Sequence, residues 1–199
     1  MPVDLAEQVV GLVRPHPAVR EIHLAGSRAD GRATEWSDWD FLVTAHDFAA
    51  LGDALPRLLA PLDPLVQQWD RLSPQWCWML ILHGPRKVDL IFPDEPHELE
   101  PPWEPTAENL HGIDDHFWDW MLWLKGKEAA GKDDVVATEL EKLSKHILQP
   151  LGTTGRPRSI HDSIALYRAA RADAERRFDR DVPRDVEAAV APALERGGR

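Results

Sequence analysis

Two aspartates, Asp38 and Asp40, are separated by one residue and stand at the start of the apolar run Phe41–Val43. Because side chains alternate between the faces of a strand, both carboxylates are expected on one face, roughly 7 Å apart at about 3.3 Å per residue. Carboxylates held this close repel each other unless a cation lies between them. A hard divalent ion such as Mg²⁺ binds oxygen ligands and shares them with substrate phosphates. The pair therefore predicts a metal site.

Two further features fit the same chemistry. A turn at Gly26 and Ser27 follows the apolar run Ile22–Ala25, and a glycine there allows close approach of a ligand to backbone N–H groups that bind phosphate oxygens. Asp89 interrupts the apolar run Val88–Phe92, where burying a lone carboxylate would be costly, so it is expected to face a metal or a solvated cleft. Three carboxylates on neighbouring strands beside a phosphate-binding turn indicate two-metal phosphoryl or nucleotidyl transfer.

The order of these features resembles the DNA polymerase β-like nucleotidyltransferase superfamily: an apolar segment with Gly-Ser, a ten-residue gap, Asp-x-Asp and a later aspartate on a strand. The small size and the helical second half resemble most the bacterial aminoglycoside and lincosamide nucleotidyltransferases. The resemblance implies that Asp38 and Asp40 bind two Mg²⁺ ions and that Asp89 binds the ion that activates the acceptor hydroxyl. It also implies that the triphosphate of ATP or another NTP is held by consecutive residues, Gly26, Ser27 and Arg28.

The composition of the 199-residue chain bears on the partners. With a formal net charge of -11, the chain lacks the excess of basic residues that nucleic-acid binding requires. This argues against a polymerase or an RNA-tailing enzyme. The same charge would attract a polycationic acceptor such as an aminoglycoside. No apolar run reaches the roughly 18 residues that span a bilayer, and the N-terminus carries no basic leader. We therefore expect no membrane partner and a cytoplasmic location, and the sequence leaves a homodimer open.

A proline-rich linker, residues 96–112, is predicted to divide the chain. Residues 1–95 are predicted to form the nucleotidyltransferase domain, an α/β (α+β) fold with a mixed sheet and flanking helices, and residues 113–199 an all-α domain. The stretch 93–107 is expected to continue neither a strand nor a helix. Apolar periodicity and turn residues predict two helices and five strands in the first domain: helices Val3–Val13 and Phe48–Leu59, and strands Ile22–Ala25, Phe41–Val43, Leu65–Trp69, Trp76–Leu82 and Val88–Phe92.

The resemblance to antibiotic nucleotidyltransferases also implies that the second half helps to form the acceptor pocket and, as in some members of that family, carries a carboxylate base. The candidates for the base are Asp114, Asp115, Asp119 and Glu128. Asp114 and Asp115 precede a helix of wide apolar surface and are interpreted as helix caps. Asp119 lies between Trp118 and Trp120 on that helix and is the preferred candidate. Further helices are predicted from Asp133 to Pro150, from Ser159 to Phe178, and around Val186 and Val190 before a frayed end at Arg199.

These features predict Mg²⁺-dependent transfer of a nucleoside monophosphate, AMP from ATP in the first instance, to a hydroxyl of a small molecule. An aminoglycoside-type antibiotic is the expected acceptor, and pyrophosphate is released. Of the nine tryptophans, Trp36 and Trp39 flank Asp38 and are candidates for stacking on a nucleobase or a sugar, although core packing is the plain alternative. Two other functions stay open: an antitoxin-type enzyme that adenylylates a partner protein, and a non-catalytic nucleotide-binding protein.

Overall fold

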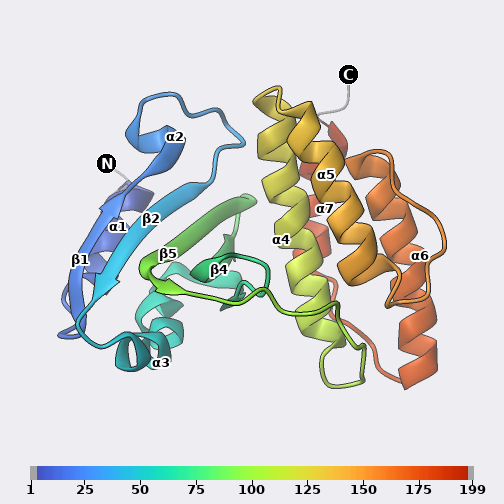
Figure 1. Ribbon diagram of the computed structural model, residues 1–199, viewed down its shortest axis with the longest axis horizontal. Coiled ribbons are helices and arrows are strands. Elements are labelled where there is room, and N and C mark those ends of the chain that lie inside the picture. Colours follow the sequence, from blue (N-terminus) through green and yellow to red (C-terminus); the bar gives the residue numbers. More distant parts are fainter. Residues whose placement is uncertain (1–3, 197–199) are drawn as a thin grey trace. The chain divides into compact units, whose positions relative to one another are not determined.

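The computed structural model describes residues 4–196, which form two compact units that meet in sequence between Glu100 and Pro101 (Figure 1). The first unit contains a five-stranded sheet with helices, and the second is helical. The structure thus confirms the predicted α/β (α+β) class, in which a mixed sheet with flanking helices is followed by an all-α region.

The sheet has the strand order β1-β2-β5-β4-β3. β2 and β5 run parallel, and the other neighbouring strands are antiparallel. In the parallel pair, Asp40 of β2 is the register partner of Asp89 of β5. Two of the predicted metal ligands therefore stand side by side in the sheet. The five strands are β1 (Val19–Leu24), β2 (Trp39–Ala45), β3 (Pro64–Trp69), β4 (Gln75–Leu82) and β5 (Arg86–Pro96).

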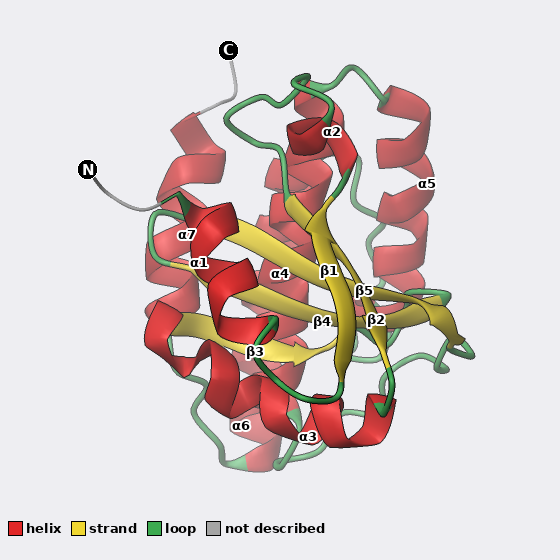
Figure 2. Cartoon of the chain, turned by 90° about the vertical axis from the view of Figure 1, so that its left-hand side faces the viewer, coloured by secondary structure: helices red, strands yellow, loops and turns green. Residues whose placement is uncertain are grey.

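One face of the sheet packs against α1 (Leu5–Val13) and α3 (Phe48–Leu59), as Figure 2 shows. A short 3₁₀ helix, η1 (Ala60–Leu62), follows α3. Alternate strand residues enter this core, as the two-residue period of a strand requires. The intervening positions, which include Asp40 and Asp89, project from the opposite face. The core residues that define the pattern in β2 and β5 are Phe41, Val43, Val88, Leu90 and Phe92.

Four tryptophans lie in the core of this unit or pack against it: Trp39, Trp69, Trp76 and Trp78. The ring of Trp69 lies 5.2 Å from that of Trp76 and 5.0 Å from that of Trp78, both edge to face. Phe48 of α3 lies 5.7 Å from the Trp69 ring. Such tilted and edge-to-face arrangements are the preferred packing of aromatic rings. Core packing, the plain alternative for Trp39, is therefore observed for this residue as well as for Trp69, Trp76 and Trp78.

The second unit consists of four α-helices and a π-helical segment in the described part of the chain. The π-helical segment, η2, continues α5, where the sequence predicts an α-helix up to Pro150. No helix within residues 4–196 has both the length and the apolar character needed to cross a bilayer. The elements are α4 (Leu110–Ala129), α5 (Asp133–Leu143), η2 (Ser144–Leu148), α6 (Ile160–Phe178) and α7 (Asp185–Arg196).

The structure corrects two predicted boundaries. β5 continues to Pro96, although the sequence predicts that the strand ends at Phe92. A proline removes only a donor, so it is tolerated where the ladder needs no N–H, and a register shift accompanies the pairing of Pro96 with Gln75. α4 begins at Leu110, so the predicted cap residues lie inside the helix.

Other predicted boundaries agree more closely. α3 spans the predicted residues, and α6 begins directly after its N-cap Ser159, whose side chain accepts a hydrogen bond from the Asp162 N–H. α1 begins at Leu5, whereas the predicted start at Val3 lies outside the described residues. The predicted frayed end at Arg199 lies outside them as well.

Candidate metal centre

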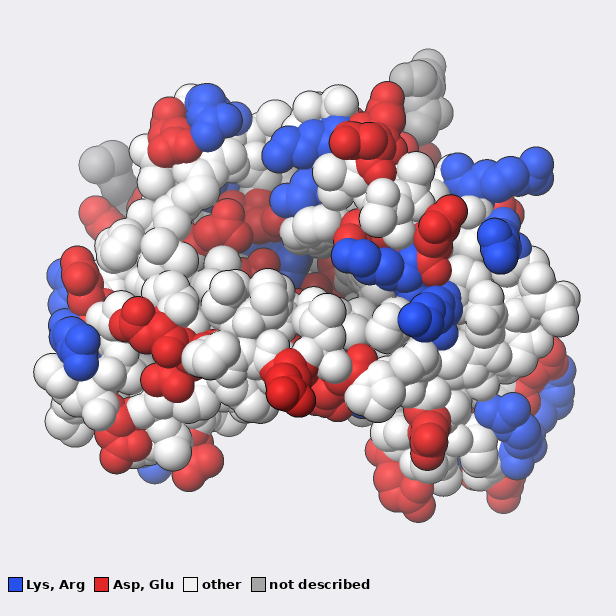
Figure 3. Space-filling model, viewed as in Figure 1, with Lys and Arg blue, Asp and Glu red and all other residues white. Residues whose placement is uncertain are grey.

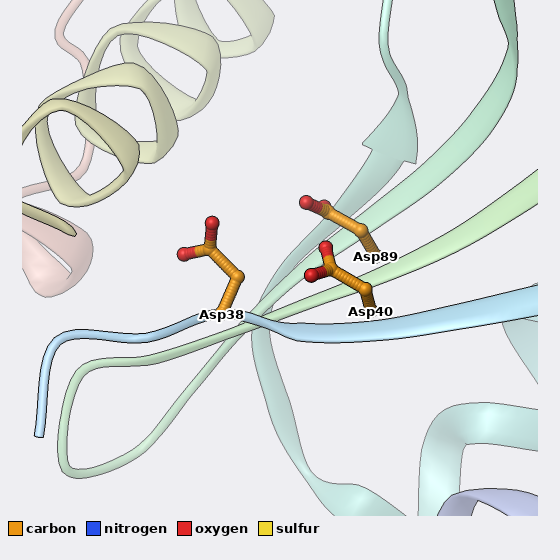
Figure 4. Close-up of side chains that lie close together, drawn as sticks. All are labelled: Asp38, Asp40 and Asp89. Atoms are coloured by element: carbon orange, nitrogen blue, oxygen red, sulfur yellow. The ribbon is translucent and has the colours of Figure 1, made fainter. Parts of the chain in front are cut away.

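Asp38, Asp40 and Asp89 converge on the face of the sheet that points away from α1 and α3. One carboxylate oxygen of each lies within 4.8 Å of the others. Asp38 immediately precedes β2, Asp40 lies in β2, and Asp89 lies in β5. Figure 4 shows the carboxyl groups of Asp40 and Asp89 next to each other, with that of Asp38 projecting to the same side. Three hard oxygen donors at this spacing are ligands that Mg²⁺ prefers.

Burial makes this cluster costly without compensating positive charge. Asp38 is 9% and Asp89 8% exposed, and Asp40 is half-buried. Charged groups are almost never this buried unless they are paired. Lys87 supplies one positive charge, because its Nζ lies 2.6 Å from Asp89 Oδ1. The guanidinium of Arg28 also interacts electrostatically with Asp38 and Asp40. Three carboxylates this close together still repel one another, and a divalent cation between them would relieve that repulsion.

Gly26 is fitted to this carboxylate face in two ways. It is the first residue of the short helix α2 (Gly26–Ala29) and has a φ of 64°, a left-handed conformation that side chains disfavour. A Cβ atom at this position would lie 2.3 Å from Asp40 Oδ2. The preceding residue, Ala25, donates its N–H to the Asp40 carbonyl oxygen over 2.8 Å. The turn therefore lies against Asp40 so closely that only glycine fits.

Ser27 and Arg28 follow in α2 and differ in their surroundings. Ser27 is half-buried, and its role in phosphate binding stays a prediction. Arg28 fastens the segment that carries Asp38: its Nε lies 3.1 Å from the carbonyl oxygens of both Ser37 and Asp38, and its Nη2 lies 2.7 Å from that of Ser37. Arg28 thus has a positioning role, which the sequence did not indicate, beside its predicted phosphate contact, which stays a prediction.

The Arg28 guanidinium also covers an aromatic ring. Its Cζ lies 4.0 Å from the centroid of the Trp39 ring, a cation–π contact that further restrains the arginine. Burial lowers the pKa of Arg28, and the nearby carboxylate of Asp38 acts in the opposite direction. One ring face of Trp39 is therefore covered by a side chain of the protein.

Lys87 is the site residue that the sequence analysis missed. The signal was the spacing Lys87-Val88-Asp89, which places two opposite charges on one face of a strand whose other face is apolar. Lys87 is 7% exposed. A lysine this buried needs a partner, and a partner two residues away on the same strand is the simplest one.

Among the base candidates in the second unit, Asp114 and Glu128 form close ion pairs. Asp114 Oδ1 accepts hydrogen bonds from Tyr167 Oη at 2.8 Å and from Arg171 Nη1 at 2.7 Å. Burial raises the pKa of Asp114, and Arg171 counteracts that rise. Glu128 pairs with Lys125 at 2.6 Å. The interpretation of Asp114 as a helix cap is therefore wrong, because this carboxylate joins α4 to α6.

Asp115 and Asp119 also lie inside α4. The interpretation of Asp115 as a cap is wrong because the helix begins five residues earlier, at Leu110, after the N-cap residue Asn109. Asp119 is 6% exposed, and its role as a base stays a prediction. The three metal-ligand candidates are thus brought together within the first unit, whereas Asp119 belongs to the second.

Asp115 provides a test of how burial acts on α4. Burial raises the pKa of Asp115 from 3.8 to about 7, His111 lowers it and Asp114 raises it. The folded state holds the Asp115 proton more tightly than the unfolded state does, so the neutral carboxyl contributes to the free energy of unfolding. This contribution is fully present below about pH 4 and is lost as the pH rises to about 7. We expect Asp115→Asn to be more stable than the natural protein above that range, by up to about 4 kcal/mol, and similar to it near the acidic limit.

Urea unfolding at several pH values measures this difference. Asp53→Asn removes an exposed carboxylate from α3 and is the control for the loss of one negative charge from a helix. A stability difference between Asp115→Asn and the natural protein that is independent of pH would contradict the assignment.

Comparisons with known proteins add little to this geometry. No protein-family model matches the chain, and no curated protein matches it in sequence. Among solved structures, the crystal structure of an aminoglycoside 6-adenyltransferase from Bacillus subtilis is similar over 96% of each chain, with 10% sequence identity and a TM-score of 0.34. A likeness this weak carries no argument about function, which must rest on the site.

Proposed function

We propose that this protein is a nucleotidyltransferase that moves a nucleoside monophosphate, AMP from ATP, to a hydroxyl group of a small molecule. One observation carries the proposal: Asp38, Asp40 and Asp89 converge within 4.8 Å beside a turn in which Gly26 has no room for a side chain. Converging carboxylates beside a glycine turn suit phosphoryl and nucleotidyl transfer, in which divalent metal ions hold the phosphate oxygens.

The donor set fits a divalent cation. The three carboxylates offer hard oxygen atoms within 4.8 Å of one another, and two of the three residues are buried, so their mutual repulsion favours a bound cation. Asp38, Asp40 and Asp89 would hold Mg²⁺, which would neutralise triphosphate charge and lower the pKa of the acceptor hydroxyl.

The chain's own residues would arrange the substrates. The N–H groups at the start of α2, at Gly26 and Ser27, would donate to triphosphate oxygens, and Arg28 would keep the Asp38 segment in place. The acceptor oxygen attacks the α-phosphorus in line, so that a new O–P bond forms while the bond to the β-phosphate breaks and pyrophosphate leaves. The hydroxyl proton passes to a carboxylate base, for which Asp119 is our candidate.

Charge supports a cationic acceptor. The chain carries a formal net charge of -11, and Figure 3 shows acidic side chains interspersed with basic ones over the face that it draws. A polycationic, hydroxyl-bearing molecule of the aminoglycoside type would be attracted to such a protein. Modification of an antibiotic of this type, and hence resistance to it, is the biological role that we propose.

Pyrophosphate release tests the proposal. The full chain is incubated with Mg²⁺, each of the four NTPs in turn, and a panel of aminoglycosides, lincosamides and cell extract. We expect release with ATP and an aminoglycoside, and none when the metal is chelated. Transfer of labelled AMP to a protein of the extract would favour the antitoxin-type alternative. Binding of NTP without release on any acceptor would favour the non-catalytic one, and the absence of both binding and release would overturn the proposal.

A further inference from the structure

Lys87 occupies a place that a metal ion would also favour. Its ammonium nitrogen lies 2.6 Å from Asp89 Oδ1, and both side chains are largely buried, with 6% and 11% of the side-chain surface exposed. Asp89 is one of the three carboxylates whose oxygens converge within 4.8 Å. The protein therefore places a positively charged group of its own in direct contact with a candidate metal ligand.

The backbone holds this cation in position. Lys87 and Asp89 lie on the same face of β5, which is paired on both sides, with β2 and with β4. The residue between them, Val88, is fully buried in the core on the other face. Since a strand in the middle of a sheet cannot turn over, the ammonium group stays on the carboxylate face.

An ammonium group and a divalent ion compete for the same negative charge. An ion that approaches Asp89 is repelled by the Lys87 charge, and it must share the carboxylate or displace the lysine. A triphosphate changes the balance, because its oxygens supply negative charge and offer the lysine an alternative partner. Metal binding at Asp89 and nucleotide binding would then favour each other.

We propose that Lys87 is an internal counter-ion that competes with divalent metal for Asp89, so that this part of the site takes up metal together with the triphosphate rather than before it. The inference rests on the proposed function for its nucleotide step. Its metal step stands without that function, because it concerns only Lys87, Asp89 and the cation.

The test is a titration of the full chain with Mn²⁺ alone, followed by the paramagnetic signal of the free ion. Removal of the lysine charge in Lys87→Met is expected to tighten Mn²⁺ binding on the order of tenfold, a typical coupling between two sites. Lys87→Arg keeps the charge and should bind close to the natural protein. Arg86→Met removes the same charge from the exposed neighbouring residue and controls for the change in net charge.

The opposite sign would overturn the proposal. If Lys87 only oriented Asp89, its loss would weaken metal binding by about 10- to 100-fold, as the loss of an outer partner of a metal ligand typically does. If Mn²⁺ affinity increased equally in Lys87→Met and Arg86→Met, the change would be explained by net charge alone. That result would also contradict competition between Lys87 and the metal.

A measurement on the natural sequence covers the case in which Lys87→Met does not fold. In protein labelled with ¹⁵N-lysine, the Lys87 ammonium resonance, assigned by its loss in Lys87→Arg, is expected to shift when Mg²⁺ is added. An unchanged resonance at saturating Mg²⁺ would contradict displacement.

A second titration separates the two proposals. It is repeated with a non-hydrolysable ATP analogue, after correction for metal bound by the analogue alone. We expect the analogue to tighten Mn²⁺ binding more in the natural protein than in Lys87→Met. Tightening by Lys87→Met in metal alone, without any response to the analogue, would keep the metal step and refute nucleotidyl transfer.

Discussion

Asp40→Asn is expected to lower nucleotidyl transfer by at least about a thousandfold, the upper range for loss of one electrostatic contribution to a transition state. Asp40 is the central member of the carboxylate group: it is the register partner of Asp89, and its Oδ2 lies against the turn at Gly26. The amide keeps the shape of the side chain but removes the charge that would hold the metal.

The same change should leave the fold intact or stabilise it. Replacing one of three converging carboxylates relieves repulsion in the metal-free protein, a common relation between stability and activity at functional sites. Pyrophosphate release and thermal unfolding without metal measure the two effects. Asp30→Asn, an exposed substitution just after α2, is the control. Transfer within tenfold of the natural rate in Asp40→Asn would refute the assignment of this residue, as judged against the expected scale.

Gly26→Ala is expected to have the second largest effect. The new Cβ would lie 2.3 Å from Asp40 Oδ2, so either the turn or the carboxylate must move. The φ of 64° adds backbone strain of about 1–3 kcal/mol for a residue with a side chain. We expect transfer to fall by about a hundredfold, as when a reacting group is misplaced by about 1 Å, and urea unfolding to show lower stability.

Gly31 offers a matched control for the strain. Its φ is 68°, and a Cβ there would meet no atom within 4 Å. Gly31→Ala therefore shares the backbone penalty of Gly26→Ala and lacks the contact with Asp40. If both variants lost transfer equally, the close approach of Gly26 to the carboxylate would have no part in the site.

The site geometry could be predicted in part from local pattern. The spacing of Asp38 and Asp40 and the single charge in Val88–Phe92 assign acidic groups to one face of two strands, because the side-chain period of a strand is two residues. The apolar residues between them then pack on α1 and α3. The periodicity of a strand does not reveal which other strand it pairs with, so the adjacency and register of β2 and β5 could not be predicted from it. The resemblance to nucleotidyltransferases implies only that their carboxylates share a site.

Other site features arise only from tertiary contacts. Arg28 donates to the carbonyl oxygens of Ser37 and Asp38, and carbonyl positions in a loop have no sequence signature. The sequence identifies Gly26 as a turn residue. That a side chain at this position would collide with Asp40 is evident only from the folded structure. In each case the residue type was visible, and its partner was decided by the folded chain.

The helical half shows the same division. Apolar spacing predicts where most of its helices lie, because one side of a helix must be buried and that requirement is written in a 3.6-residue period. The Asp114–Arg171 pair lies across 57 positions of the chain, and burial together with this neighbour sets the pKa of each group. The fold class, the strand faces and the three acidic residues of the candidate site thus follow from local pattern and from the family resemblance. Only the tertiary structure decided which charges meet, since pairing and desolvation depend on distances through space rather than along the chain.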